Sequence, residues 1–107
     1  MKQSPRSKKF ATTIRQQLPQ CISAVLTPNQ VGLLTVTAVE VSGDLRHAAV
    51  YVTSLKAPKR YISTLNKSMG RIREMLQRKV KLVRSLDIIF YEDGGKAHGM
   101  WAEEIMQ

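Results

Sequence analysis

The side chains of this sequence best suited to chemistry are cations gathered in one segment. Residues 56–84 contain ten lysines and arginines against a single acid, Glu74. Arginine binds phosphate through two parallel hydrogen bonds, whereas lysine acts as a point charge. Such a run departs from the mixed-sign surface of an ordinary protein, so it indicates a polyanionic partner. Its cations are Lys56, Lys59, Arg60, Lys67, Arg71, Arg73, Arg78, Lys79, Lys81 and Arg84.

The remaining charge is also segregated along the chain. Residues 1–39 hold five basic residues and no acidic one, whereas residues 85–107 hold five acidic residues and a single base, Lys96. With 17 basic and 8 acidic residues in total, the formal net charge is +9. Segregated like charge costs self-repulsion in the compact state, which a polyanion relieves. On charge alone RNA, DNA and an anionic membrane surface all qualify.

Catalytic and metal-binding chemistry finds little support in the residue pattern. Cys21 is the only cysteine, and with two histidines it cannot make a standard zinc site, so no metal or cofactor is expected. Cys21 is expected to be a small buried side chain in a reducing compartment. Ser42, Asp44 and His47 fall in one short polar segment, where serine and aspartate side chains stabilise a turn, so a hydrolytic site is not expected.

The basic segment coincides with the clearest helical pattern of the chain, residues 60–84. Its apolar residues recur at alternating steps of three and four, and Arg60, Lys67, Arg71 and Arg78 fall together on the opposite side. We expect these four side chains to form an exposed ridge. The apolar stripe consists of Ile62, Leu65, Met69, Ile72, Leu76, Val80 and Val83.

An amphipathic helix is also predicted over residues 7–26, from apolar residues three or four positions apart. Ser4-Pro5 or Ser7 is expected to begin it. Pro19 removes an interior backbone hydrogen bond, so we expect either a kink just before Pro19 or a helix that restarts there. Residues 27–32 are expected to form a loop.

Three segments have strand-like composition: residues 33–41, 47–55 and 86–91 are rich in Val, Ile, Thr, Leu and aromatic residues. The first two are joined by the polar residues 42–46, which predicts a hairpin with a loose turn. The order helix, strand, strand, helix, kink, helix, strand predicts an α+β fold. In it, three helices cover one face of a two- or three-stranded sheet.

The hairpin contains a specific sequence motif. It resembles the central hairpin of the ribosome-binding factor A family, which consists of bacterial and organellar factors that mature the small ribosomal subunit. The resemblance extends over about residues 6–105, and the hairpin is its specific part. The matching residues are Val39, Glu40, Val41, Ser42, Asp44, Leu45, Ala48, Val50, Tyr51 and Val52.

The resemblance implies a type II KH-like domain with a three-stranded sheet packed on helices. Ordinary KH domains hold phosphates with a Gly-x-x-Gly loop, and this family has an Ala-x-Gly interhelical kink instead. The matching residues here are Ser68-Met69-Gly70, which we expect to shape the helix pair, with the serine hydroxyl capping the second helix. The sequence differs from the motifs of the family at Thr27, Asn29, Ser85 and Trp101.

We therefore expect a single KH-like RNA-binding domain over residues 1–107. The resemblance implies that it binds the small ribosomal subunit and its ribosomal RNA and assists RNA processing without catalysis. It also implies a monomer located in the cytoplasm or, alternatively, inside an organelle. The residues expected to contact RNA are Lys59, Arg60, Lys67, Arg71, Arg73, Arg78, Lys79, Lys81 and Arg84.

Two other functions stay open at this stage. A generic KH module for single-stranded RNA or DNA is disfavoured by the missing Gly-x-x-Gly loop and by the scarcity of aromatics for base stacking, Tyr61 and Tyr91 being the candidates. A small nuclease is disfavoured because no convincing catalytic group is present. A membrane-surface role ranks below both, since the apolar stripe of the helix is needed for the core.

Overall fold

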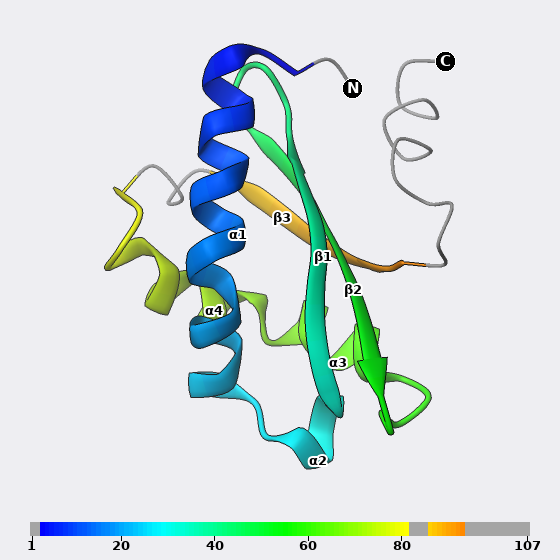
Figure 1. Ribbon diagram of the computed structural model, residues 1–107. Coiled ribbons are helices and arrows are strands. Elements are labelled where there is room, and N and C mark those ends of the chain that lie inside the picture. The colour runs from blue at the N-terminus through cyan, green and yellow to red at the C-terminus, as the bar shows by residue number, and fades with distance from the viewer. Residues whose placement is uncertain (1–2, 82–85, 94–107) are drawn as a thin grey trace.

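The structure, a computed structural model, describes residues 3–81 and 86–93 (Figure 1). Arg84, one of the expected RNA contacts, lies outside the described residues, as do Ser85 and Trp101. The elements follow the predicted order, with one short helix added before the hairpin. They are α1 (Pro5–Val25), α2 (Pro28–Val31), β1 (Leu33–Val41), β2 (His47–Leu55), α3 (Tyr61–Lys67), α4 (Met69–Gln77) and β3 (Asp87–Glu92).

The three strands form one sheet in the order β1-β2-β3. β1 and β2 are antiparallel, with Leu33 opposite Leu55, and they have the bounds predicted from the sequence. β3 pairs with β2 in parallel, with His47 opposite Asp87. Because parallel neighbours cannot be joined by a tight turn, the chain between β2 and β3 crosses the sheet through α3 and α4.

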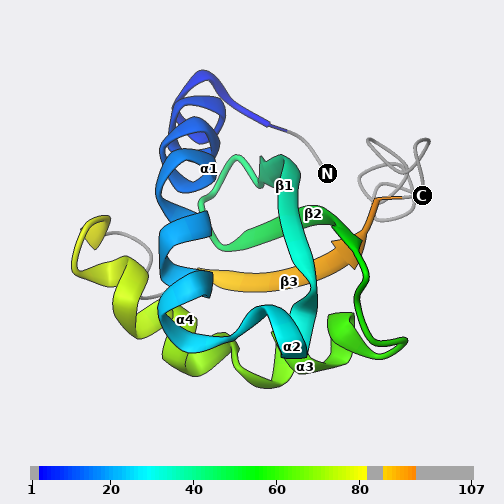
Figure 2. The same cartoon turned by 60° about the horizontal axis from the view of Figure 1, so that its bottom comes forward.

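One face of the sheet carries the hydrophobic core. Alternate residues of the strands, such as Val50 and Phe90, belong to the same buried cluster as side chains of α1, α3 and α4. Figure 2 shows these helices gathered on one side of the strands. The apolar stripe predicted for the basic segment is confirmed over its described part. Its buried members are Leu65, Met69, Ile72, Leu76 and Val80, and Ile62 is partly buried.

Local capping determines where α1 begins. The Ser4 and Ser7 side chains exchange hydrogen bonds with each other's backbone N–H groups, and Pro5 occupies the first helical position, where no N–H donor is needed. The helix continues through Pro19, so the predicted restart there is wrong. Burial of the apolar face of α1 against β1 and α4 stabilises the helix enough to tolerate one missing hydrogen bond.

The expectation of a simple loop at residues 27–32 is wrong, because α2 forms there. The backbone N–H of Thr27 donates to Gln30 Oε1 at 2.9 Å, and Pro28 is pre-set for the first turn. The turn ends at Gly32, whose φ of +69° is a conformation that L side chains rarely adopt. Ser54 Oγ donates to the carbonyl oxygen of Val31, so the turn is held against the end of β2.

The chain breaks between α3 and α4 at Ser68, which confirms the predicted interhelical kink. The Ser68 N–H donates to the carbonyl oxygens of α3, and its own carbonyl accepts from Arg71 and Ile72 of α4. The expected cap by the serine hydroxyl is wrong, since no side-chain cap bond forms. α4 ends at Gln77, so the predicted helix is wrong over residues 78–81, and residues 82–84 lie outside the described residues.

β3 is an edge strand, and one side chain of α3 forms hydrogen bonds with its backbone. Asn66 Nδ2 donates to the carbonyl oxygen of Phe90 at 3.2 Å, and the Phe90 N–H donates to Asn66 Oδ1 at 2.9 Å. The amide therefore imitates a neighbouring strand at this point. Satisfying these groups ties the crossover to the sheet and blocks pairing with another chain.

Gly32→Ala is expected to destabilise the protein by at least about 2 kcal/mol, because it combines a strained backbone with steric overlap. A Cβ at this position would overlap the carbonyl oxygen of Leu55 and lie 2.5 Å from Ser54 Oγ. Urea unfolding of the variant beside the parent protein measures the change. A variant with unchanged stability would mean that the Gly32 turn relaxes at no cost.

Gly70→Ala serves as the matched substitution, with the opposite sign. Gly70 lies in the first turn of α4, is exposed, and has open space where a Cβ would be built. Its φ is not positive, so the interhelical break does not depend on a strained glycine. Alanine is expected to raise the free energy of unfolding by up to about 1 kcal/mol. A clear fall in the thermal midpoint would contradict this.

Candidate nucleic-acid interface

The basic residues predicted to contact RNA lie at the surface wherever the structure describes them. Arg71 and Arg78 are exposed and lie two turns apart along α4, away from the buried Ile72 and Leu76. Arg73 is only partly exposed. The other exposed members of the predicted set are Lys59, Arg60, Lys67, Lys79 and Lys81.

The four cations of the predicted ridge are all exposed, as expected, but the predicted break at Ser68 divides them between two helices. Arg60 is the residue before α3 and Lys67 is its last, whereas Arg71 and Arg78 belong to α4 and its C-terminal cap. The break at Ser68 ends the regular rotation of one helix, so angles calculated along a single helix no longer relate the two pairs. The cations therefore divide between two supports.

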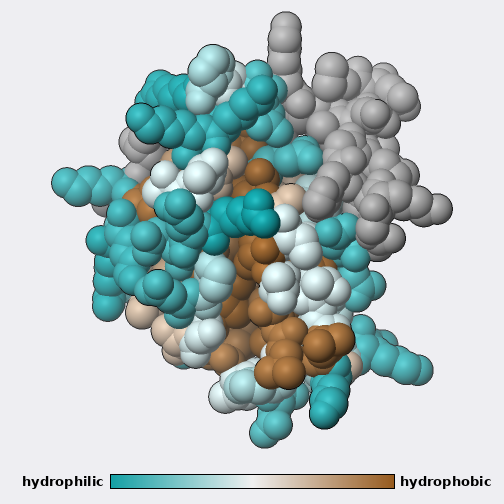
Figure 3. Space-filling view, viewed as in Figure 1, coloured by the Kyte–Doolittle hydropathy of each residue, from teal (hydrophilic) through white to brown (hydrophobic). Residues whose placement is uncertain are grey.

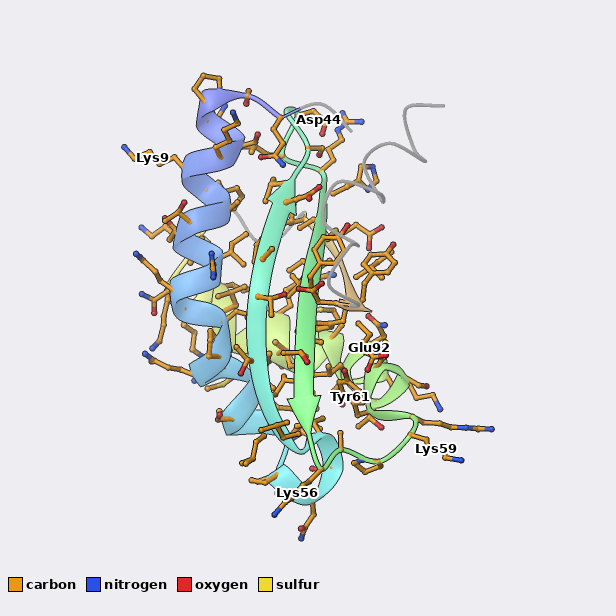
Figure 4. The ribbon with its side chains drawn as sticks, turned by 45° about the vertical axis from the view of Figure 1, so that its right-hand side comes forward. Lys9, Asp44, Lys56, Lys59, Tyr61 and Glu92 are labelled. Carbon is orange, nitrogen blue, oxygen red and sulfur yellow. The ribbon has the colours of Figure 1, made fainter. Side chains whose placement is uncertain are left out.

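The first support consists of α4 and the residues after it, packed against α1. Lys79 Nζ donates to Gln20 Oε1 of α1 at 2.8 Å. Arg6 and Lys9 share the helix face of Gln20, because they precede it by whole helical turns at steps of three and four. Figure 4 shows Lys9 directed away from the sheet. We call the exposed cations of this region the α1–α4 basic surface: Arg6, Lys9, Arg71, Arg78, Lys79 and Lys81.

Sequence reasoning did not include Arg6 and Lys9 among the candidate site residues. The signal available was the absence of any acid from residues 1–39. What periodicity alone did not reveal is that α1 packs beside α4, which brings two basic segments distant in sequence onto neighbouring helices.

A shallow hollow of about 450 Å³ lies at the C-terminal end of α4. Arg78 and Lys81 line it together with Gln77 and Glu74, the single acid of the basic segment. Two cations around an open depression suit a phosphate group, which reaches them without leaving solvent. This end of α4 is therefore the part of the basic surface best shaped for a polyanion.

The second support is the connection between β2 and α3. Lys56 and Lys59 project from this part of the molecule, far from Lys9 (Figure 4). Both side chains are exposed, and Lys56 has a φ of +58° just after the end of β2. The exposed cations thus stand on two supports, and Lys67 at the end of α3 lies between them along the chain.

Of the two candidate tyrosines, Tyr61 is not placed for stacking on bases, and Tyr91 is only partly exposed. Tyr61 is buried, and its hydroxyl donates to Glu92 Oε2 at 2.7 Å, which ties α3 to β3. Burial, with the hydrogen bond to Glu92 and the negative charge of Glu92, raises the pKa of Tyr61 well above its usual value. Tyr91 lies against Tyr51 with ring centroids 5.8 Å apart. Recognition of the phosphate backbone and of RNA shape fits this surface better than stacking on single bases.

The described residues provide no catalytic constellation. Within them, no three His, Cys, Asp or Glu side chains come together as a metal site would require. Ser42 Oγ donates to Asp44 Oδ1 at 2.6 Å and accepts from the His47 N–H at 3.0 Å, which confirms the predicted turn. Burial raises the pKa of the Cys21 thiol, as expected for a packed side chain. None of the described helices is long and apolar enough to cross a membrane.

Comparison with known proteins agrees with this architecture. The sequence pattern that defines ribosome-binding factor A matches residues 6–106. Ribosome-binding factor A of Desulfitobacterium hafniense is 31% identical over 105 residues, covering 95% of this chain and 84% of the relative. The protein of that name from Halorhodospira halophila is 35% identical over 96 residues, covering 86% of this chain and 76% of the relative. The chain belongs to the ribosome-binding factor A family.

Solved structures of ribosome-binding factor A share the fold. The crystal structure of the Thermus thermophilus protein has a TM-score of 0.71 and 26% identity, covering 80% of this chain and 94% of the other. The solution structure of a Thermotoga maritima protein described as a putative ribosome-binding factor A has a TM-score of 0.69 and 28% identity. The match covers 89% of this chain and 93% of the other. The KH-like α+β fold expected from the sequence is therefore confirmed.

A third similar structure concerns a complex. It is a homology model of the Thermus thermophilus ribosome-binding factor A, fitted into a cryo-electron microscopy map of that factor with the 30S subunit. Its TM-score is 0.65 at 28% identity, covering 76% of this chain and 88% of the other. The fold described above is thus one that, in that relative, has been placed on a small ribosomal subunit.

Proposed function

We propose that this chain binds the small ribosomal subunit through its ribosomal RNA and assists maturation and processing of that RNA. The observation that carries the proposal is the α1–α4 basic surface on the fold of ribosome-binding factor A. The fitted Thermus thermophilus complex supports the choice of partner. The cations expected to touch RNA are Lys59, Arg60, Lys67, Arg71, Arg73, Arg78, Lys79, Lys81 and Arg84, with Arg6 and Lys9 added from α1.

The proposed action is binding without catalysis. Arginines at the end of α4 hold backbone phosphates of structured RNA, and the packing of α3 and α4 in the core fixes their spacing. A factor that binds one arrangement of a flexible RNA more tightly than others shifts the population towards it. The protein then acts as a monomer in the cytoplasm, or inside an organelle, wherever immature subunits are present.

The interhelical break supports structured RNA over single strands. A KH module for single-stranded nucleic acid brings the backbone of a Gly-x-x-Gly loop against phosphates. Here Ser68 is the only residue between α3 and α4, and Gly70 already belongs to α4. No loop is available to clamp an extended strand at this point.

Purified protein is expected to co-sediment with small ribosomal subunits at low salt and to be released steeply as salt rises. Each phosphate neutralised releases counterions, so the logarithm of the binding constant falls with the logarithm of salt concentration by roughly 0.7–0.9 per contact. Sucrose-gradient sedimentation across a salt series measures the slope. Absence from the subunit fraction at low salt would remove the proposed function, and a flat salt response would remove its electrostatic basis.

The double variant Arg71→Glu with Arg78→Glu is expected to lower subunit binding and to reduce the salt slope by about two contacts. Because both side chains are exposed, the free energy of unfolding should change by no more than about 0.5 kcal/mol per substitution. Fluorescence anisotropy with labelled small-subunit RNA fragments, together with thermal unfolding, reads both quantities.

The matched control is Lys8→Glu with Arg15→Glu, which changes the net charge by the same amount. Both residues are exposed on α1, and they line a shallow depression beside β1 rather than the side facing α4. If the control loses as much RNA affinity as the α4 variant, the total charge of the protein governs binding and the local assignment fails.

A further inference from the structure

An apolar groove runs beside the first strand of the sheet. Its walls are the C-terminal half of α1, the short helix α2 and the first half of β1, and its volume is about 520 Å³. Figure 3 shows apolar surface continuing between α1 and β1 and over the lower ends of the strands. None of the described residues that line the groove is charged, and its main apolar side chains are Ile22, Leu26, Val31, Leu33, Val36 and Leu55.

Two leucines at the mouth of the groove face solvent. Leu33 is 58% exposed and Leu55 is 69% exposed, and they are directly opposite each other on β1 and β2. Among the described residues, the only other large apolar side chain with comparable exposure is Ile89, at 39%. Exposed apolar surface of this kind, continuous with a groove, marks a site of interaction.

The shape of the groove favours an extended peptide. β1 is an edge strand, and four consecutive residues from Leu33 to Val36 line the groove, so the strand presents its edge as well as its side chains. Within the described residues, no backbone hydrogen bond joins this stretch to an element other than β2. An open edge beside apolar pockets accepts a further strand by backbone pairing, and the pockets then select side chains.

The groove is already formed in the unbound protein. The Gly32 turn and the hydrogen bond from Ser54 to Val31 fix α2 against the end of β2. The wall opposite β1 is the continuous helix α1. Binding to a rigid groove avoids the cost of ordering its walls, so a short segment of a partner can dock there.

Charge identifies the chemistry of the occupant. The elements that form the groove contain no acidic residue before Glu40, and Lys56 follows Leu55 at its mouth. An apolar segment flanked by acidic residues complements these walls. RNA does not, because the lining offers neither a cation for phosphate nor an aromatic ring for a base.

We propose that this groove binds an extended apolar segment, with acidic flanks, of a protein component of the small ribosomal subunit. The inference rests on the proposed function, which supplies the subunit as partner. It adds a second, mainly apolar contact on the side of α1 that faces β1, separate from the basic surface that α1 shares with α4.

The double variant Leu33→Thr with Leu55→Thr tests the groove, since threonine keeps strand propensity and removes the apolar mouth. We expect subunit affinity to fall by about tenfold or more because burial of the two leucines is lost. The salt slope should stay that of the parent protein, and affinity for protein-free small-subunit RNA should not change. The control is Ile89→Thr, which removes an exposed apolar side chain from β3 and should bind subunits normally.

A photo-crosslinking residue placed at Leu55 identifies the occupant directly on purified subunits. A crosslinked product destroyed by protease and resistant to ribonuclease supports the proposal, and one destroyed by ribonuclease overturns it in favour of RNA. Unchanged subunit affinity of the Leu33, Leu55 variant, or an equal loss on protein-free RNA, overturns it as well. Failure of the parent protein to bind subunits instead counts against the proposed function itself.

Discussion

The parallel pairing of β2 with β3 determines where this protein carries its positive charge. A parallel neighbour cannot be reached by a tight turn, so the chain from Lys56 to Leu86 must cross one face of the sheet. The crossing segment buries an apolar stripe against the strands, which leaves its outer side in solvent. Ten of the 17 basic residues belong to this segment. The connection required by the topology is therefore also the candidate RNA surface.

The crossover holds its position through polar contacts at the edge of the sheet as well as through the core. Asn66 satisfies both backbone groups of Phe90, and Tyr61 donates to Glu92. These bonds join α3 to β3 without using the exposed side chains of Arg71 and Arg78. Side chains that are not needed for folding are free to bind a partner, and their mutual repulsion favours one that is anionic.

Elements with a local cause were predictable from the sequence. The Ser4 cap, the hairpin strands and the break at Ser68 each follow from residues close in the chain. The end of α4 was missed because Val80 keeps the apolar period of the helix yet is buried outside it. Periodicity reports burial, and burial continues where the helix does not.

The two glycines show why the rest could not be read from the sequence. Gly32 and Gly70 both stand beside a helix end, but Gly32 has a positive φ and no room for a side chain, whereas Gly70 has neither constraint. The difference arises because Gly32 meets Leu55 and Ser54, which are more than twenty positions away. The exposure of Arg71 and Arg78 was predictable because it follows from the local apolar period of α4. The division of the cations between two supports depends on tertiary packing and was not predictable.

Helix α1 connects the two kinds of surface that the protein presents. On one side it packs against α4 and adds its own cations to those of the crossover. On the other side it forms the wall of an uncharged groove beside β1. Contacts with phosphates are strong but independent of RNA sequence. A charge-rich protein therefore needs shape or apolar contacts to select one position on a particle covered with phosphate. Placing both surfaces on a single rigid helix fixes the distance between them, and that distance is itself a means of selection.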